Sequence, residues 1–406
     1  MANIGAMRKE SVRHLFLEGI AHLPVPTRPM GTPPRILLLR PDHLGDILFM
    51  TPALHTLRAA LPDAHIACLV GPWAQPILAH NADLDELLTC DFPWFNRRPK
   101  VSLVQPYAAL WREAARLRRQ RFDVALIMRF DFWWGAALAR LAAIPRRIGY
   151  ARRDVQPFLT DAVPYQPGRH EAEQNMRLIE AFIADSPFLP SRPWQEGQDD
   201  RPVKTLHFTI TAGDSAWAAE HLAPPADSGY PPPDARPLIA IHPGAGAAVK
   251  LWSAEGWVTV ATALSRRYGA TIVFTGGAGE LPLVRAIAGR LTVPHIVLAG
   301  QTTLGQLAAV FARCRLALGP DSGPLHLAVA VGTPTVHLFG PADPGLFGPW
   351  GNPARHTVVQ ARYFDIPCRK RPCNRLDYTA AQLAHHACMQ TITVDDVLDA
   401  VQRIYR

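Results

Sequence analysis

The chain has few lysines, few cysteines and no long apolar run. Only five of its 42 cationic residues are lysine, and the others are arginine. No stretch of about 18 apolar residues occurs, which excludes a membrane-spanning helix from the sequence. Six cysteines among 406 residues are too few for a disulfide framework, and the N-terminus lacks the pattern of a secretory signal. We therefore expect a cytoplasmic protein.

Positive charge is present in excess and is unevenly distributed. The net charge is +8, and between Phe92 and Arg153 there are 14 Arg and Lys residues against three acids. This excess suits an anionic partner such as a phosphorylated glycan or an anionic membrane surface. A solvated face on an arginine-rich protein is the alternative. Nucleic acid is disfavoured, because no recognition motif accompanies the charge.

Two successive series of apolar strands and helices predict an α/β fold. Continuous apolar strands between helices are typical of a parallel sheet that is covered on both faces. The predicted strands are 35–40, 65–71, 123–128, 238–241, 271–275, 295–298, 316–318 and 335–339. The predicted helices are 46–61, 76–88, 133–143, 253–267, 280–290, 303–312 and 325–331. We expect two Rossmann-like domains that face a cleft, with ligands at the carboxyl ends of the strands.

Proline-rich pieces predict where the domains separate. They occur at 189–193, 223–225 and 231–233, and proline fixes φ and removes a hydrogen-bond donor, so extended connectors are expected there. The predicted organisation is, in order, an N-terminal extension, an N-terminal domain, a Pro-rich linker, a C-terminal domain and a C-terminal helix, over residues 1–34, 35–225, 226–236, 237–390 and 391–406.

The turn that follows the first strand contains a candidate catalytic carboxylate. Gly45 permits a tight strand-to-helix turn, and Asp46 begins the next helix. Taken alone, the position of Asp46 favours a helix N-cap over a catalytic role. No Gly-x-Gly-x-x-Gly follows this strand, so the turn is not a dinucleotide-binding fingerprint.

Three turns in the second series could hold a nucleotide. The Gly/Ala-rich turn 242–252 exposes backbone N–H groups, and Lys250 adds a point charge, which suits a diphosphate; a flexible turn with an exposed lysine is the alternative. It does not fit the P-loop pattern. In the turn 319–328, Ser322 at a helix N-terminus could donate to a phosphate. Glu280 is an acceptor suited to ribose hydroxyls.

These turns together resemble glycosyltransferase family 9, the ADP-heptose:lipopolysaccharide heptosyltransferases. The similar segments run from about Arg35 to the C-terminus. They are Arg40-Pro-Asp-His-Leu-Gly-Asp-Ile-Leu-Phe-Met-Thr-Pro-Ala-Leu54, His242-Pro-Gly-Ala245 with Lys250 and Trp252, Thr275-Gly-Gly277 with Glu280, and Asp321-Ser-Gly-Pro-Leu-His-Leu-Ala328 with Gly332-Thr-Pro334.

The resemblance implies a GT-B fold and an inverting transferase that needs no metal or other cofactor. It implies that the acceptor binds the N-terminal domain, that the nucleotide sugar binds the C-terminal domain, and that the helix within 391–406 crosses back to the N-terminal domain. The resemblance implies Asp46 as catalytic base. The implied nucleotide-sugar-binding residues are His242, Gly244, Ala245, Lys250, Glu280, Asp321, Ser322, Gly323 and His326. The implied donor is ADP-heptose.

The resemblance also implies the partners. The acceptor would be an anionic glycolipid or oligosaccharide of the lipopolysaccharide core, reached by peripheral contact with the inner membrane. Ser322 stands where threonine is usual in the family, which keeps the hydroxyl. Two alternatives remain open: a nucleotide-sugar-binding protein without transfer activity, and the same mechanism with another nucleotide sugar.

Two further features suggest weaker hypotheses. Residues 8–23 place apolar side chains near helical spacing, which is compatible with a helix lying on a membrane or one packed on its own protein. Cys368, Cys373, His385 and Cys388 could form a loose zinc site, although their spacing is not that of a common zinc finger. We assign no metal ligands on this basis.

Overall fold

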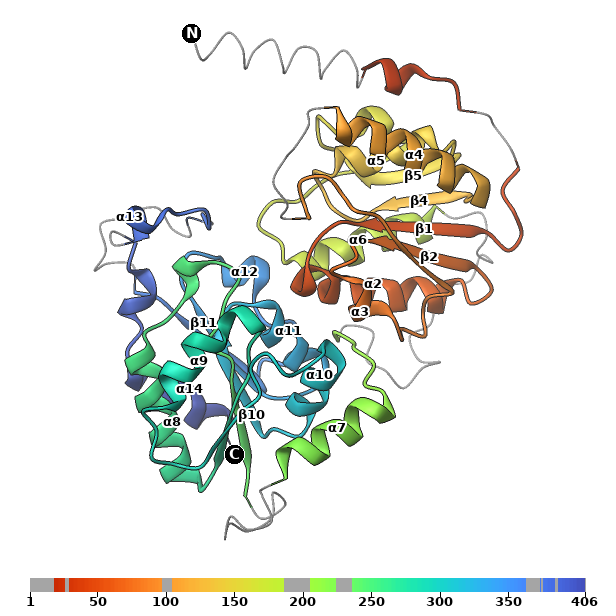
Figure 1. The fold of residues 1–406 in the computed structure, drawn as a ribbon. Coiled ribbons are helices and arrows are strands. Elements are labelled where there is room, and N and C mark those ends of the chain that lie inside the picture. Colours follow the sequence, from red (N-terminus) through yellow and green to blue (C-terminus); the bar gives the residue numbers. More distant parts are fainter. Residues whose placement is uncertain are drawn as a thin grey trace. The chain divides into compact units, whose positions relative to one another are not determined.

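The structure comprises two units, each built on one parallel sheet (Figure 1). It is a computed structural model that describes residues 18–25, 29–96, 104–185, 205–223, 236–362, 373, 375–383 and 386–405. The first unit comprises residues 1–43 and 50–203, and the second comprises residues 44–49 and 204–406. The proline-rich pieces at 189–193 and 231–233, residues 224 and 225 of the piece at 223–225, and the first ten residues of the segment 8–23 lie outside the described residues.

The first sheet has six strands in the order β3-β2-β1-β4-β5-β6. Its strands are β1 (Arg35–Arg40), β2 (His65–Val70), β3 (Glu86–Thr89), β4 (Val124–Ile127), β5 (Arg146–Tyr150) and β6 (Asp161–Val163). All neighbours pair in parallel, beginning with Ile36 opposite Ile66 and Val124 on its two sides. Strand β4, and β1 and β2 after their first residues, are buried, because helices cover both faces of the sheet (Figure 1).

The helices of this unit are α2 (Leu44–Ala60, of which residues 44–49 belong to the second unit), α3 (Gln75–Leu78), α4 (Gln105–Gln120), α5 (Trp133–Leu141) and α6 (Glu171–Ala184), with a 3₁₀ turn at Gln156–Phe158. The predicted helix over 76–88 is wrong. The helix ends at Leu78, and the Asn81 side chain accepts the N–H of Asp83 at 2.9 Å, forming a turn that leads into strand β3. Residues 18–22 are helical, and Ile20 packs into the core of this unit.

The second sheet repeats the topology, in the order β12-β11-β10-β7-β8-β9. Its strands are β7 (Leu238–Ile241), β8 (Thr271–Phe274), β9 (His295–Val297), β10 (Leu316–Pro320), β11 (Thr335–Phe339) and β12 (His356–Gln360). Both sheets have the Rossmann order, in which the direction of chain progression reverses between the first and fourth strands. These are β1 and β4 in one unit and β7 and β10 in the other. The predicted α/β class with two Rossmann-like domains is confirmed.

The second unit includes α7 (Ala212–Leu222), which precedes its first strand, and α14 (Val394–Ile404), which follows its last strand. Its helices are α7 (Ala212–Leu222), α8 (Ala254–Tyr268), α9 (Leu281–Ala288), α10 (Leu304–Ala312), α11 (Gly323–Ala330), α12 (Pro344–Phe347), α13 (Ala380–Leu383) and α14 (Val394–Ile404), with 3₁₀ turns at Ala248–Lys250, Ala278–Glu280 and Cys388–Thr391. The sequence placed residues up to 225 in the N-terminal domain, whereas α7 packs on α10 and buries Ala218 and Leu222. Helix α14, expected to return toward the N-terminal domain, packs on α8, β11 and β12, because Val397, Ala400 and Val401 complete that core. Among the described residues, no helix is both long and apolar enough to cross a membrane.

Two neighbouring tryptophans near the start of α8 allow the contribution of one hydrogen bond to the free energy of unfolding to be measured. Trp252 and Trp257 meet edge to face at 4.9 Å, and both are buried. The indole N–H of Trp252 donates to the carbonyl of Ile392 at 3.0 Å, whereas that of Trp257 has no hydrogen-bond partner among the described residues. Trp252→Phe should therefore lower the free energy of unfolding by about 1 kcal/mol more than Trp257→Phe. Urea unfolding checks this, and equal losses would contradict it.

Candidate functional site

The loops after β7, β8 and β10 bring the predicted nucleotide-binding residues of the second unit to one edge of its sheet. Because the strands are parallel, their carboxyl ends lie side by side. The structure places there a group that we call the β7/β10 site: His242, Lys250, Thr275, Glu280, Asp321, Ser322 and His326. Thr275 is the member whose side chain the sequence analysis did not select.

An ion pair joins the two central strands of this site. Lys250, at the end of the 3₁₀ turn after β7, donates from Nζ to Asp321 Oδ2 at 2.6 Å. The two side chains are only 15% and 7% exposed. Burial raises the pKa of Asp321, but the His326 hydrogen bond and the Lys250 charge outweigh it and lower that pKa to about 2. Asp321 is therefore ionised at neutral pH.

Two buried polar atoms beside this pair have no hydrogen-bond partner among the described residues. Ser322 is the N-cap of α11, yet its hydroxyl caps no backbone N–H, and its Oγ is unpartnered. His326 lies with Nε2 at 3.6 Å from Asp321 Oδ1, and its Nδ1 is unpartnered. An unsatisfied buried polar atom costs about 1–3 kcal/mol. The Ser322 hydroxyl, next to the positive end of α11, is therefore suited to donate to an anionic ligand, and His326 Nδ1 can do so when the ring is protonated.

Glu280 connects the loops after β7 and β8. Its carboxylate accepts the N–H of Gly277 at 2.7 Å and lies 3.7 Å from Nε2 of His242. Burial lowers the pKa of His242 although Glu280 opposes this, and its Nδ1 lies 3.1 Å from the Thr275 hydroxyl. A Cβ at Gly244 would lie 1.9 Å from Oε1 of Glu280, so any other residue here would displace the Glu280 carboxylate. The next residue, Ala245, is partly exposed.

A line of polar side chains that the sequence analysis missed runs from the site along β11. The His337 ring lies 5.3 Å from that of His326, and its Nε2 lies 2.9 Å from the Thr335 hydroxyl. The same hydroxyl lies 2.9 Å from Nδ1 of His356, which pairs with Thr335 across β11 and β12. Burial lowers the pKa of His337 well below its usual value, and burial with the Arg355 charge lowers that of His356 to about 4. The alternation of Thr335 and His337 on one strand face was the available signal.

Asp46 lies in the first turn of α2 and is partly exposed. The N-cap of this helix is His43, so Asp46 is not the N-cap residue but the third residue of the helix. A carboxylate in this position is stabilised by the helix dipole. The role of Asp46 as the catalytic base remains a prediction.

The carboxyl ends of β1 and β4 hold a second ion-pair network. Arg40, only 1% exposed, pairs from Nε with Asp42 at 2.6 Å and donates from Nη2 to Glu171 at 2.7 Å. Arg129 pairs with both Asp42 and Asp131. Burial lowers the pKa of Arg129, but these two carboxylates raise it above its usual value. Arg40 and Asp42 stood in the first motif, yet its spacing did not reveal the pairing of Asp42 with Arg129 or of Arg40 with Glu171.

The zinc hypothesis remains untested. Cys368 and His385 lie outside the described residues. Cys373 lies with Sγ at 3.6 Å from the Tyr378 hydroxyl, and Cys388 is buried. Within the described ranges, no group of three or more His, Cys, Asp or Glu residues is arranged to hold a metal ion.

Comparison with known proteins decides the family. Residues 110–379, about two thirds of the chain, match the family described as "Glycosyltransferase family 9 (heptosyltransferase)". The chain belongs to glycosyltransferase family 9. This confirms the resemblance seen in the motifs and makes the protein a glycosyltransferase.

Individual relatives of this family 9 glycosyltransferase span most of its length. Lipopolysaccharide heptosyltransferase 3 of Escherichia coli K12 is 28% identical over 372 residues, which are 89% of this chain and 95% of the relative. A family 9 glycosyltransferase from Veillonella parvula has a TM-score of 0.71 at 24% identity, covering 92% and 97% of the two chains. The E. coli ADP-heptose lipopolysaccharide heptosyltransferase II has a TM-score of 0.67 at 20% identity, covering 91% and 98%. These structures confirm the GT-B fold.

The Asp321 carboxylate should contribute to the stability of this glycosyltransferase in a pH-dependent way. Its pKa falls from 3.8 to about 2 on folding, so ionised Asp321 contributes about 2 kcal/mol above pH 4. Because the folded pKa is the lower one, this contribution is lost as the pH falls from about 4 toward 2. Asp321→Asn should lower the free energy of unfolding at pH 7 by about 2 kcal/mol. The difference in this free energy between the variant and the unaltered protein should become smaller as the pH falls from about 4 toward 2.

The matched control is Asp377→Asn. Asp377 pairs with Arg375 at 2.9 Å, but the two side chains are 84% and 48% exposed, so solvent screens this pair. Urea unfolding of both variants at several pH values makes the comparison. A loss for Asp377→Asn as large as that for Asp321→Asn would contradict the stabilising role of the buried pair.

Proposed function

We propose that this glycosyltransferase moves a heptose from ADP-heptose to an anionic glycan acceptor of the lipopolysaccharide core, with inversion at the anomeric carbon. The observation that carries the proposal is the β7/β10 site. There Lys250 pairs with Asp321 beside the start of α11, where the buried Ser322 Oγ has no hydrogen-bond partner among the described residues. The names of the related E. coli enzymes, a lipopolysaccharide heptosyltransferase and an ADP-heptose lipopolysaccharide heptosyltransferase, support the sugar and the nucleotide.

In this proposal the β7/β10 site binds the donor through its diphosphate. The Lys250 ammonium has three hydrogens, one of which is directed to Asp321 Oδ2, so it can also donate to a phosphate. Ser322 Oγ and the N-terminus of α11 supply further stabilisation of negative charge. Glu280 accepts from the ribose hydroxyls, and the loop at Gly244 and Ala245 approaches the diphosphate with its backbone.

The reaction we propose is a single displacement. The Asp46 carboxylate takes the proton of the acceptor hydroxyl while that oxygen forms a bond to the anomeric carbon. The bond from this carbon to the diphosphate oxygen breaks on the opposite face, and its electron pair leaves with ADP. Lys250 and the positive end of α11 stabilise the charge that develops on the leaving group, which is the function of a metal ion in other transferases.

The acceptor would bind the first unit, where cationic and aromatic side chains lie together near the end of β4. The Phe130 and Tyr165 rings stack at 4.6 Å, and the exposed Arg152 guanidinium lies 5.6 and 5.5 Å from them. Arg129 lies 5.8 Å from the Phe130 ring. Aromatic faces suit sugar rings, and guanidinium groups suit phosphates and carboxylates. Trp134, in contrast, belongs to the core.

Asp46→Asn tests the proposed chemistry. It should lower kcat for heptose transfer from ADP-heptose by about 100- to 10,000-fold, because the proton acceptor is lost, and leave ADP-heptose affinity nearly unchanged. Lys250→Ala should instead weaken ADP-heptose binding by about tenfold or more. Calorimetry measures binding, and a coupled ADP-release assay measures turnover.

The control is Asp63→Asn, which removes an exposed carboxylate just after α2 and should leave both quantities unchanged. Full turnover by Asp46→Asn would overturn the assignment of the base. Binding of ADP-heptose without turnover by the unaltered protein would favour a binding protein. Preference for a UDP- or GDP-sugar would keep the mechanism and change the donor.

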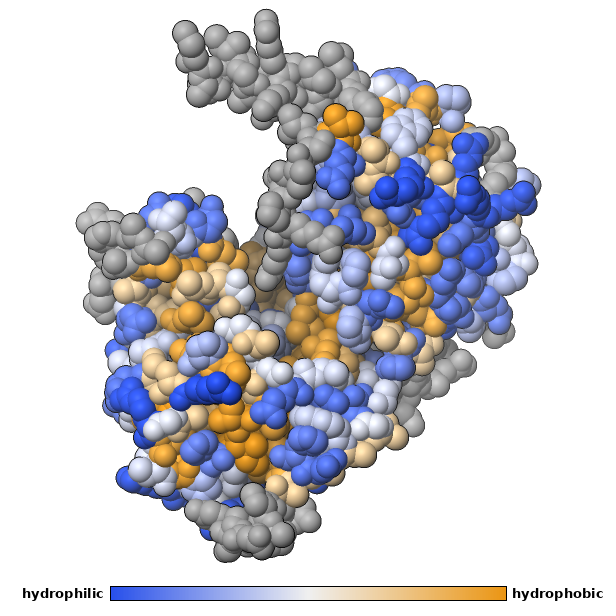
Figure 2. Space-filling model, in the orientation of Figure 1, coloured by the Kyte–Doolittle hydropathy of each residue, from blue (hydrophilic) through white to orange (hydrophobic). Residues whose placement is uncertain are grey.

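We further propose that the enzyme contacts the membrane of its acceptor through α4. The exposed face of this helix carries Trp111, 50% exposed, with Arg112, Arg118 and Arg119, and Val104 precedes it at 70% exposure. Figure 2 shows hydrophilic side chains over the part of the first unit where Figure 1 places α4. Exposed aromatic residues beside arginines are typical of surfaces that bind anionic lipids.

Arg112→Gln/Arg119→Gln should reduce binding to phosphatidylglycerol vesicles by about tenfold or more, since each arginine contributes about 1 kcal/mol near an anionic surface. Co-sedimentation at low salt measures this, with phosphatidylcholine vesicles as the uncharged comparison. The matched variant Arg266→Gln/Arg267→Gln removes two exposed arginines from the last turn of α8 and should bind normally. Equal losses for the two pairs would show only a general charge effect.

A further inference from the structure

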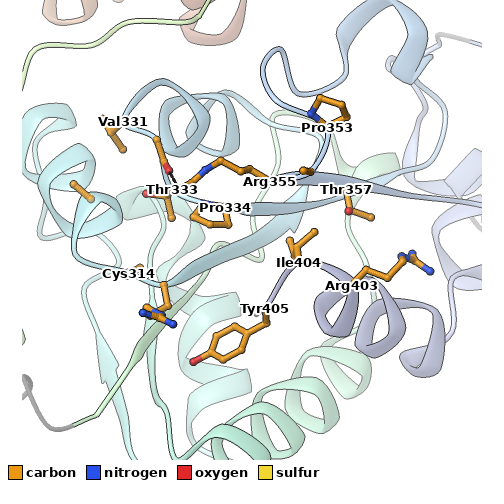
Figure 3. A pocket seen from close by; sticks show the side chains of 14 residues that line it. Cys314, Val331, Thr333, Pro334, Pro353, Arg355, Thr357, Arg403, Ile404 and Tyr405 are labelled. Atoms are coloured by element: carbon orange, nitrogen blue, oxygen red, sulfur yellow. Dashed lines mark hydrogen bonds between the residues drawn. The ribbon is translucent and has the colours of Figure 1, made fainter.

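The second unit has a cavity at the edge of its sheet opposite the β7/β10 site (Figure 3). Its volume is about 760 Å³. It is lined by segments around the starts of β10, β11 and β12 and by the end of α14. The lining residues are Ala312, Cys314, Arg315, 331–334, 353–355, Thr357 and 403–405. Because the nucleotide-binding loops follow the strands and these segments precede them, the cavity is separate from the proposed donor site.

Three arginines line this cavity, and no Asp or Glu among the described residues does. They are Arg315, Arg355 and Arg403. Within the described part of the chain none of the three forms an ion pair, whereas Arg290 and Arg362 in the same unit pair with Glu255 and Asp396. Unpaired like charges around one cavity repel each other, so an anion bound there would be stabilised.

The carboxyl ends of three helices offset part of the positive charge of the arginines. Helices α10, α11 and α14 all end at the cavity, and the carboxyl end of a helix carries about half a negative charge. Arg355 donates from Nη2 to the carbonyl of Gly332, just after α11, at 2.5 Å. Three guanidinium charges still exceed three half charges, so the cavity remains positive.

The walls are fixed by contacts that do not involve a ligand. The Thr333 hydroxyl donates to the carbonyl of Phe311 at 2.7 Å, which ties the loop after α11 to α10. The Tyr405 ring lies 4.1 Å from that of Tyr268, and the Arg315 guanidinium lies 6.0 Å from the Tyr405 ring. These contacts, with the hydrogen bond from Arg355 to Gly332, order Arg315 and Arg355 before a ligand arrives.

We propose that this cavity binds a phosphate-bearing molecule. The guanidinium fork matches phosphate oxygens, and the volume lies within the range of about 300–1,000 Å³ typical of small-molecule sites. The apolar part of the wall, formed by Val331, Pro334 and Ile404, would contact the remainder of the ligand. This site is independent of the proposed transferase chemistry.

Calorimetry with inorganic pyrophosphate tests the proposal on the full chain. The unaltered protein should show two binding events. Lys250→Ala should retain the event at the arginine cavity, and Arg355→Gln/Arg403→Gln should lose it, with at least about a tenfold fall in affinity. If the double variant does not fold, Arg403→Gln alone, which removes a side chain with no ion pair or hydrogen bond among the described residues, should weaken that event about threefold.

Arg313→Gln is the matched control, because Arg313 is exposed beside the cavity but does not line it. It should bind pyrophosphate normally. In Lys250→Ala, glycerol 3-phosphate should displace pyrophosphate if the ligand is a free phosphate ester, and phosphatidic acid vesicles should do so if it is a lipid headgroup. An unchanged second event in the arginine variants, an equal loss in Arg313→Gln, or displacement by neither probe would overturn the proposal.

Discussion

The β7/β10 site depends on the buried ion pair between Lys250 and Asp321. It joins two strands that are neighbours in the sheet but 71 residues apart in the chain. A buried pair is stable only where further hydrogen bonds offset the loss of hydration, and here His326 lies against the second oxygen of the same carboxylate. The pair therefore positions the start of α11, where Ser322 and His326 keep their unpartnered atoms, relative to the loop after β7.

The first unit has an ion pair in the equivalent place. Asp42 follows β1 and pairs with Arg129 after β4, and Lys250 follows β7 and pairs with Asp321 after β10. In both sheets the contact spans the point where the strand order reverses, with the charges exchanged between the two loops. At this point the chain continues from the two strands to opposite faces of the sheet. The ion pair fixes the two loops relative to each other at the carboxyl ends of the strands, where ligands bind in this fold.

Local contacts were predictable from the sequence, and distant ones were not. The turns at Asp46, Lys250, Glu280 and Ser322 follow strands as expected, because glycine and polar residues end apolar runs. The helix predicted over 76–88 is wrong, because the chain leaves the helix after Leu78 and an Asn81 turn leads it into β3. The packing of α7 and α14 on the second unit depends on buried faces that periodicity alone cannot assign to a partner. His337 resembled an ordinary strand residue until its neighbours were known.

The position of Thr335 restricts how protons are placed in the interior of the second unit. Its one hydroxyl lies at hydrogen-bond distance from both His337 and His356, and a hydroxyl can donate only a single proton. At least one of the two rings must therefore carry hydrogen on the nitrogen that faces the threonine. Where that ring is His337, its Nδ1 is a bare lone pair as long as the ring is neutral. The tautomer of His356, which lies away from the proposed nucleotide-sugar site, thus affects through Thr335 and His337 the surroundings of His326.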